Sequence, residues 1–156
     1  MAGRKPGPNE SVRLETVVLC FGDPERIALR RETRTLVTGF TMDDRLGACV
    51  RELAAGSLTG GLPSLPPGTA LRHAFVDPWG LAYLDFNRRL LGARVSGDGE
   101  EWLAVASIVR SVCDNFPEIR EVRFMVDGEV VTSLGGVIDC EEPLRAEDFP
   151  DTEGGP

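Results

Sequence analysis

The chain has 156 residues, 42% of them hydrophobic, which suits one compact domain with short tails. Its formal net charge of -8 argues against a nucleic-acid partner, because the phosphate backbone requires clustered positive charge. No apolar run reaches the roughly 18 residues of a transmembrane segment, and residues 1–11 lack the apolar centre of a signal peptide. We therefore expect a soluble chain that either stays inside the cell or has lost an anchor.

The N-terminal part predicts a leader followed by two strands. Residues 1–11 contain structure breakers and nothing to bury, so we expect a disordered leader. From Arg13 to Phe21 apolar side chains alternate and finally occupy both faces, which predicts a central strand. A turn at residues 22–24 leads into a second strand over residues 27–37.

The second strand has a charged face that we expect to be solvated, because Arg30, Glu32 and Arg34 share it. Together with Arg31, the arginines Arg30 and Arg34 are candidates for an anion site or a surface that contacts a partner. A simpler interpretation is an exposed strand face, or a sheet edge that its charges protect from pairing.

Residues 41–56 predict a helix that ends at Gly56. Its apolar positions recur at three-and-four spacing and are Leu46, Cys49, Val50 and Leu53. The Gly- and Pro-rich loop that follows does not predict a phosphate-binding loop, because it lacks Gly-Lys-Ser/Thr and leads into no helix.

Two further strands are expected over residues 69–76 and 81–86, joined by a turn that contains Trp79. His73 is the only histidine and shares an alternating face with Phe75 that we expect to be mostly buried. Nucleophilic catalysis by a Ser/His or Cys/His pair would have to use His73. A structural or partly exposed histidine is the favoured interpretation.

The stretch around which the chain is organised is a long amphipathic helix that begins at Asp98 and stops before Pro117. Asp98 and Glu101 have the spacing of a capping box. A hairpin over residues 122–132 follows, closed by Asp127-Gly128. The apolar positions of the helix are Trp102, Val105, Ala106, Val109, Val112, Cys113 and Phe116.

No metal site is predicted. Asp98, Glu100 and Glu101 lack the alternating carboxylates and fixed glycine of a calcium loop, and helix capping explains them. The four cysteines have no Cys-x-x-Cys pair, and Cys49 and Cys113 are expected to be buried thiols. A disulfide remains open if the chain is exported, and any two carboxylates could form a hydrolytic pair.

These elements predict an α+β fold in one two-layer domain over residues 12–149, with a disordered tail at residues 150–156. A mixed or antiparallel sheet of about six strands, in the order β-β-α-β-β-short α-α-β-β, is expected to pack against two main helices. In the acidic C-terminal stretch we expect Pro143-Leu144 to dock and the rest to be solvated.

Eight short segments, in their order and spacing, resemble the GerMN domain, the sporulation and germination domain of bacterial envelope proteins. They are residues Thr16–Phe21, Leu53–Gly56, Leu65–Thr69, Ala82–Phe86, Ala106–Val109, Phe116–Pro117, Phe124–Gly128 and Leu134–Gly136.

The resemblance implies a non-enzymatic α+β domain similar to ring-building modules, with no catalytic residue, cofactor or metal. It also implies an extracytoplasmic or membrane-anchored setting, although the chain departs from the family in showing no signal or anchor. It departs further in having no internal repeat, whereas the germination protein carries two copies. A third departure is that Pro78-Trp79 enlarges a turn that is usually centred on glycine.

We therefore expect an assembly, scaffold or protein-interaction module of the bacterial cell envelope, with a link to sporulation. Its partner would be another protein or a second copy, through a surface that includes Arg30, Arg31, Arg34 or Trp79. An alternative is a module that binds cell-wall glycan, with Trp79 stacking on a sugar. A second alternative is a small hydrolase that uses His73 or a pair of acidic residues.

Overall fold

The computed structural model describes residues 12–25, 28–94, 98–136 and 138–149. The predicted α+β class and element order are confirmed. The elements are β1 (Arg13–Gly22), β2 (Leu29–Thr38), α1 (Met42–Ala55), β3 (Leu71–Val76), β4 (Leu81–Phe86), the 3-10 helix η1 (Arg88–Arg94), α2 (Asp98–Asn115), β5 (Glu121–Val126), β6 (Glu129–Val130) and the 3-10 helix η2 (Ala146–Asp148).

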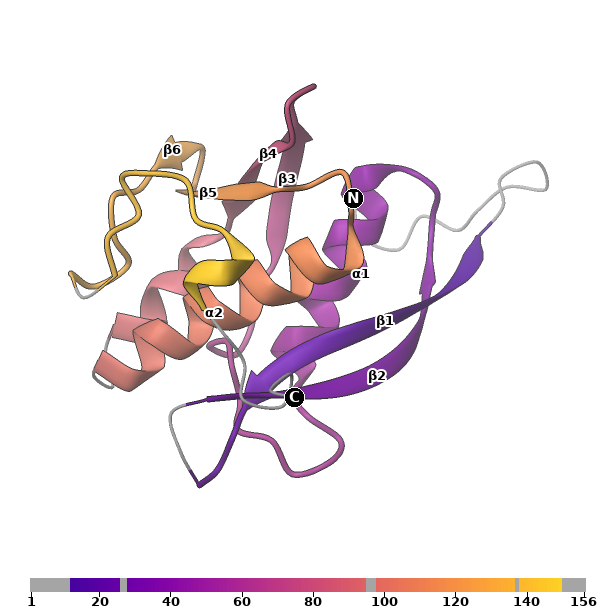
Figure 1. Cartoon of the computed structure of the whole chain (residues 1–156), viewed down its shortest axis with the longest axis horizontal. Helices are drawn as coiled ribbons and strands as arrows, with labels where there is room; N and C mark the ends of the chain where they lie inside the picture. Colours follow the sequence, from indigo (N-terminus) through magenta and orange to yellow (C-terminus); the bar gives the residue numbers. More distant parts are fainter. Residues whose placement is uncertain (1–11, 26–27, 95–97, 137, 150–156) are drawn as a thin grey trace.

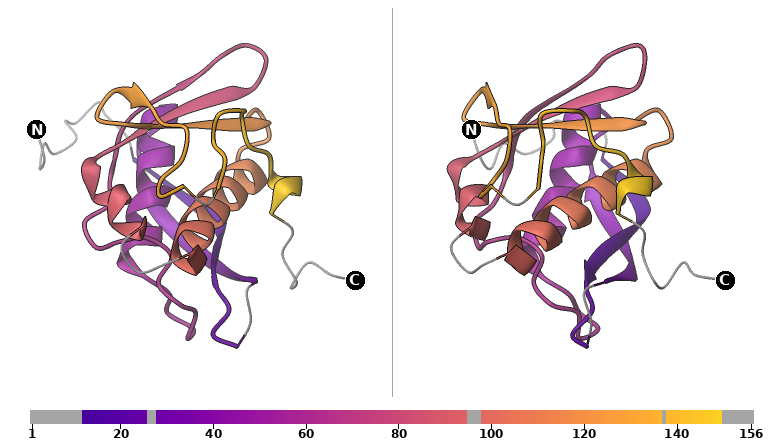
Figure 2. Two further views of the ribbon diagram at one scale, coloured as in Figure 1. Left: turned by 90° about the vertical axis from the view of Figure 1, so that its left-hand side faces the viewer. Right: turned by 60° about the vertical axis from the view of Figure 1, so that its left-hand side comes forward.

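The six strands divide between two sheets, where the sequence analysis expected one. β1 and β2 form an antiparallel hairpin, and the second sheet has the order β3-β4-β5-β6, with only the β4–β5 pair parallel. In Figures 1 and 2 the hairpin and the four-stranded sheet lie on opposite sides of the helices. The helices thus have a strand layer on each side.

Helix α2 is buried over much of its circumference. Val109, at the centre of the predicted apolar seam, is 0% exposed, which confirms that seam. Ser107 and Ser111 are also fully buried, Ser107 against Ser64 of the loop that follows α1 and Ser111 against Cys20 of β1. Each buried side chain the size of valine or leucine contributes about 1.5 to 3 kcal/mol, so α2 supplies much of the core energy.

The first helix and the last hairpin form as their local sequence predicts. The Thr41 hydroxyl accepts a hydrogen bond from the Asp44 amide at 3.0 Å and caps α1, and Gly56 ends it with a φ of 99°. At the β5–β6 turn, Asp127 and Gly128 have φ values of 49° and 84°, as this tight turn requires.

Strand β1 is not a central strand, contrary to the expectation. Beyond its pairing with β2, its outer edge is bonded by side chains of α2. The Val18 amide donates to Asn115 Oδ1 at 2.9 Å, and Asn115 Nδ2 returns a bond to the Val18 carbonyl at 2.7 Å. The Cys20 amide donates to Ser111 Oγ at 3.0 Å. Helix side chains therefore replace the neighbouring strand that the apolar pattern predicted.

The C-terminal stretch packs more extensively than predicted. Leu144 forms an antiparallel bridge with Val122, as the docking of Pro143-Leu144 anticipated. Cys140 and Phe149 are also buried, so the expectation of a solvated remainder is wrong for them. Apolar contacts explain this, since the Phe149 ring packs edge-on to Trp102 with ring centroids 6.4 Å apart.

Glu101 contributes to this docking from the first turn of α2. It is 1% exposed and accepts a hydrogen bond from the Ile138 amide at 2.7 Å, a role that the capping-box interpretation did not include. The side chains of Asp98 and Glu100, the predicted leader and the predicted tail lie outside the described residues. Among the described residues, no helix is both long and apolar enough to cross a membrane.

Candidate interaction site

The charged face of β2 is turned into the molecule, so the prediction that it is solvated is wrong. Glu32 and Arg34 are 6% and 8% exposed, respectively. They point toward the C-terminal end of α1 and the loop that follows it, which together supply their partners. Arg30, at the start of the strand, is half-buried, and Arg31 on the opposite face is exposed.

Glu32 is the centre of a dense hydrogen-bond network. Its carboxylate accepts bonds from Ser57 Oγ at 2.6 Å, Thr59 Oγ1 at 2.8 Å and the Leu58 amide at 3.0 Å. Arg34 Nε donates to it at 3.0 Å. Burial raises the pKa of the Glu32 carboxyl, but the hydrogen bonds that it accepts outweigh burial and lower the pKa to about 2.

The guanidinium of Arg34 is also fully engaged. It forms an ion pair with Glu32, donates to Glu52 Oε1 at 2.8 Å and donates to the Gly56 carbonyl at 2.5 Å. The Cζ atom of Arg34 lies 5.3 Å from the centroid of the Phe21 ring. Arg34 therefore fastens β2 to the end of α1, and the predicted surface retains Arg30 and Arg31 from this strand.

Trp79 lies at the exposed β3–β4 turn, with 80% of its surface accessible. Phe75 is 62% exposed and its ring centroid lies 6.3 Å from that of Tyr83. We call Phe75, Trp79 and Tyr83 the aromatic strip. The expectation that His73 and Phe75 face the core is wrong, because a register shift follows Leu71 and the core-facing positions are Ala74 and Val76.

His73 is exposed, and among the described residues no hydrogen bond or ion pair engages it. Asp85 is opposite it in the strand register, but its carboxylate accepts a bond from the Gly128 amide at 2.9 Å and lies 3.7 Å from Arg72. Asp85 thus holds the β5–β6 turn. The arrangement does not assemble the His73-based hydrolytic pair that we considered.

All four cysteines are free thiols, and the predicted burial of Cys49 is confirmed, while Cys113 is half-buried. Burial raises the pKa of Cys49 to about 12 and those of Cys113 and Cys140 to about 11. These three groups stay protonated at neutral pH and are poor nucleophiles. Within the described ranges, no His, Cys, Asp and Glu side chains gather in a group that could hold a metal ion.

Among the residues that the structure describes, no strand pairs with the second edge of the hairpin, which is the outer edge of β2. We call this edge open, and the sequence did not predict it. The amides of Val18 and Cys20 point away from β2, so these residues form non-hydrogen-bonded pairs with Thr33 and Arg31, their register partners. By the same alternation, the backbone groups of Thr33, Thr35 and Val37 point away from β1. The only sequence signal was this uncharged, β-branched row between the charged positions.

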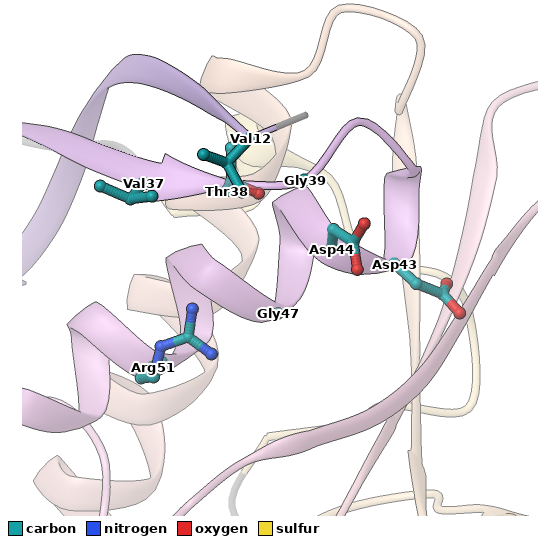
Figure 3. A pocket seen from close by; sticks show the side chains of 8 residues that line it. All are labelled: Val12, Val37, Thr38, Gly39, Asp43, Asp44, Gly47 and Arg51. Carbon is teal, nitrogen blue, oxygen red and sulfur yellow. The ribbon is translucent and has the colours of Figure 1, made fainter. Parts of the chain in front are cut away.

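A groove of about 280 Å³ lies beside the end of this open edge (Figure 3). One wall comes from the residue before β1, the end of β2 and the residue after it, and the other wall comes from α1. The lining residues are Val12, Val37, Thr38 and Gly39 on the first wall and Asp43, Asp44, Gly47 and Arg51 on the second. Figure 3 shows the Arg51 guanidinium extending from α1 toward β2.

The fold and these surfaces define the class of the protein: an α+β domain with two helices between a hairpin and a mixed four-stranded sheet. Residues 18–132, more than half of the chain, match the family model Germane, described as sporulation and spore germination. The chain belongs to this family, and the predicted resemblance is confirmed.

Solved structures share the fold. A candidate lipoprotein from Clostridium perfringens is 20% identical with a TM-score of 0.56, covering 91% of this chain and 94% of the other. The first GerMN domain of the sporulation protein GerM from Bacillus subtilis is 17% identical with a TM-score of 0.64, covering 86% and 99%. The tandem GerMN domains of GerM give the same identity and TM-score, covering 88% of this chain and 48% of theirs. Comparison with curated proteins gave no match.

Proposed function

We propose that the protein is a non-enzymatic assembly or protein-interaction module of the bacterial cell envelope that acts in sporulation. Membership of the sporulation and spore germination family supports the biological setting. The observation that carries the interaction role is the placement of large apolar side chains on the solvent side of strands and of the turns that follow them. Such side chains gain energy when a partner covers them.

Two groups of these side chains are present. At the open end of the hairpin, Leu14 and Val37 are register partners and are 70% and 62% exposed, with Phe40 nearby in sequence at 58%. On the other sheet, Phe75 and Trp79 of the aromatic strip are exposed. Val37 is β-branched and Phe75 has only two side-chain torsions, so these two side chains lose little conformational freedom when a partner buries them.

Site-specific photocrosslinking in the bacterium that produces the protein tests this function. A photoreactive phenylalanine analogue is placed at Phe40 or at Phe75, and at Glu129 on exposed strand β6 as a control. We expect a discrete adduct of defined mass, with a second copy or another envelope protein, from at least one of the two apolar positions and not from Glu129. A protein that remains an unmodified monomer at both positions would contradict the interaction role.

Binding of cell-wall glycan is the second candidate function, and the exposure of Trp79 favours it. An aromatic ring with 80% of its surface accessible can stack on the apolar face of a sugar. Purified peptidoglycan sacculi should then co-sediment the protein, and Trp79→Ala should reduce the bound fraction. Equal sedimentation of parent and variant would remove this candidate.

A further inference from the structure

The open edge of β2 and the groove beside it specify how a partner would be bound, an inference that rests on the proposed interaction function. We propose that an extended segment of a partner protein adds antiparallel to β2 as a third strand of the hairpin sheet. Its side chains on the inner face enter the groove between β2 and α1, with a basic residue beside Asp44 and an acidic residue beside Arg51.

The backbone of β2 presents unpaired groups to which a strand can add. Thr33, Thr35 and Val37 direct their amide and carbonyl groups away from β1, and β2 has no other strand neighbour in the described chain. Their side chains are all exposed and uncharged. An unpaired strand edge of this kind is a template for an added strand, unless charge, proline or a bulge blocks it. Between Thr33 and Val37 there is no proline or bulge, and the one charged side chain, Arg34, is buried on the inner face and bonded to Glu32, Glu52 and Gly56.

The groove has free space and an unbonded polar group for the side chains of the segment. Gly47 lies on its α1 wall, and a Cβ atom built there would meet nothing within 4 Å, so the wall has room for an incoming side chain. Thr38 lies on the other wall and is 5% exposed, and its Oγ1 is buried with no hydrogen-bond partner in the described chain. Such an orphaned hydroxyl is costly, and rotation about its χ1 can turn it toward a polar group in the groove.

The charges on the α1 wall define the chemistry of the segment. Asp44 and Arg51 are exposed and line the groove, and neither has an ion-pair partner among the residues that the structure describes. Asp44 lies beside the C-terminal end of β2, and Arg51 lies two turns further along α1. A bound segment that places opposite charges at these two points satisfies both.

The spacing of these charges fits a strand. Asp44 and Arg51 are seven positions apart along the helix, a rise of about 10 Å. Residues i and i+4 of a strand share a face and lie about 13 Å apart, which long basic and acidic side chains can bridge. An antiparallel segment begins beside Asp44, so its inner face has the order basic, small apolar over Gly47, acidic.

The same groove disfavours a second copy of this chain as the occupant. Two β2 edges paired about a two-fold axis would bring the α1 helix of each copy toward the other at the same depth. A single extended segment brings only its own side chains into the space between β2 and α1. The geometry therefore favours a peptide-like segment over symmetric pairing.

A synthetic peptide tests the proposal with the full chain. The probe is fluorescently labelled Thr-Arg-Thr-Val-Thr-Glu-Thr, which has Arg, Val and Glu on one strand face, and its binding is followed by fluorescence anisotropy. We expect saturable binding, with slower hydrogen exchange at the amides of Thr33, Thr35 and Val37. The absence of saturable binding would overturn the proposal.

Two proline variants locate the bound strand. Thr35→Pro removes an outward-pointing amide of β2 and spares the ladder with β1, so the variant should fold and bind the probe at least about tenfold more weakly. Thr16→Pro makes the matched change at the outer edge of β1, opposite Thr35 in the register, and should stay within about twofold of the parent. If only Thr16→Pro weakens binding, the segment adds to β1 and the assignment is wrong.

Reversal of the charge at Arg51 tests the proposed contact with an acidic residue of the segment and does not change the β2 backbone. Arg51 is exposed, so Arg51→Glu should fold normally. It should weaken binding of the original probe and strengthen binding of Thr-Arg-Thr-Val-Thr-Lys-Thr, each by about tenfold or more. Unchanged preference between the two probes would remove Arg51 from the site and contradict the proposed segment.

The oligomeric state and the crosslinking experiment complete the test. A concentration-dependent dimer that Thr35→Pro abolishes would identify a second copy as the occupant and overturn the proposal. If adducts at Phe40 or Phe75 form equally well in the Thr35→Pro protein, the interaction function stands and the β2 edge is not its contact. If no adducts form in the parent protein either, the proposed function itself fails.

Discussion

The two edges of the β1–β2 hairpin differ in how their backbone groups are satisfied. From Val18 to Gly22 the outer edge of β1 is closed by Asn115 and Ser111 of α2 and by a bridge to Leu62. On β2 the corresponding outward groups of Thr33, Thr35 and Val37 face away from the core. One edge is therefore part of the interior, and the other is part of the surface.

The difference shows that this fold does not need a strand neighbour to bury an edge. Polar side chains on a packed helix can satisfy strand amides within a core, provided that the helix is held firmly in place. The open edge needs no such support, because water can satisfy the outward backbone groups of an exposed strand. Substitutions that loosen α2 should consequently act on β1, whereas substitutions on the outer row of β2 should hardly affect stability.

The largest loss of stability is expected for Val109→Asp, which disturbs the packing of α2, the helix whose side chains close the β1 edge. Val109 is 0% exposed at the centre of α2, and an unpaired carboxylate there must be protonated or reach water by unfolding. We expect a loss of at least about 4 kcal/mol of unfolding free energy, measured by chemical denaturation. Thr33→Asp introduces the same group on the open edge and should change stability by less than about 0.5 kcal/mol. Similar losses for the two variants would show that the assigned faces are wrong.

Arg34→Ala should have the next largest effect, because it breaks the inward face of β2 and leaves its outer face intact. The variant leaves Glu32 buried without its cationic partner, although Ser57, Thr59 and the Leu58 amide still donate to it. We expect a loss of about 3 kcal/mol, at the lower end for a broken buried pair. Arg30→Ala, in the half-buried position two residues earlier, should cost less than about 0.5 kcal/mol. Equal losses of unfolding free energy for the two variants, measured by urea denaturation, would show that Arg34 does not fasten β2 to the end of α1.

Local sequence patterns predicted the elements of this molecule, and long-range packing determined what they missed. The spacing around Val109, the helix end at Gly56 and the Asp127-Gly128 turn each specify a structure within a few residues. The alternation of Arg30, Glu32 and Arg34 does not reveal which face is buried, because the partners of Glu32 and Arg34 come from the end of α1 and the loop after it, 18 to 27 residues later. The groove depends on the placement of α1 against β2, which no local pattern encodes.

The same Glu32 network predicts a specific pH dependence. The pKa of Glu32 is lowered from its usual 4.5 to about 2 in the folded protein, so its ionisation stabilises the fold above about pH 4.5. This contribution, about 3 kcal/mol, should be lost as the pH falls from about 4.5 to about 2. Unfolding free energies measured across this range should fall more steeply for the parent than for Glu32→Gln. Parallel pH profiles would show that the carboxylate is not stabilised in the folded state.

The smallest of these effects, and the most direct comparison of the two edges, comes from Asn115→Ala. The variant removes both hydrogen bonds to Val18 and should cost about 1 to 2 kcal/mol, since Asn115 is only partly buried. Hydrogen exchange should accelerate at the Val18 amide and stay slow at the Cys20 amide, which Ser111 still binds. Ser111→Ala should give the reverse pattern. The amides of Thr33 and Thr35 should exchange rapidly in the parent and in both variants, because nothing in the hairpin covers them. If the Val18 amide of the parent exchanges as fast as that of Thr33, the α2 side chains do not close the β1 edge, and the contrast between the two edges is lost.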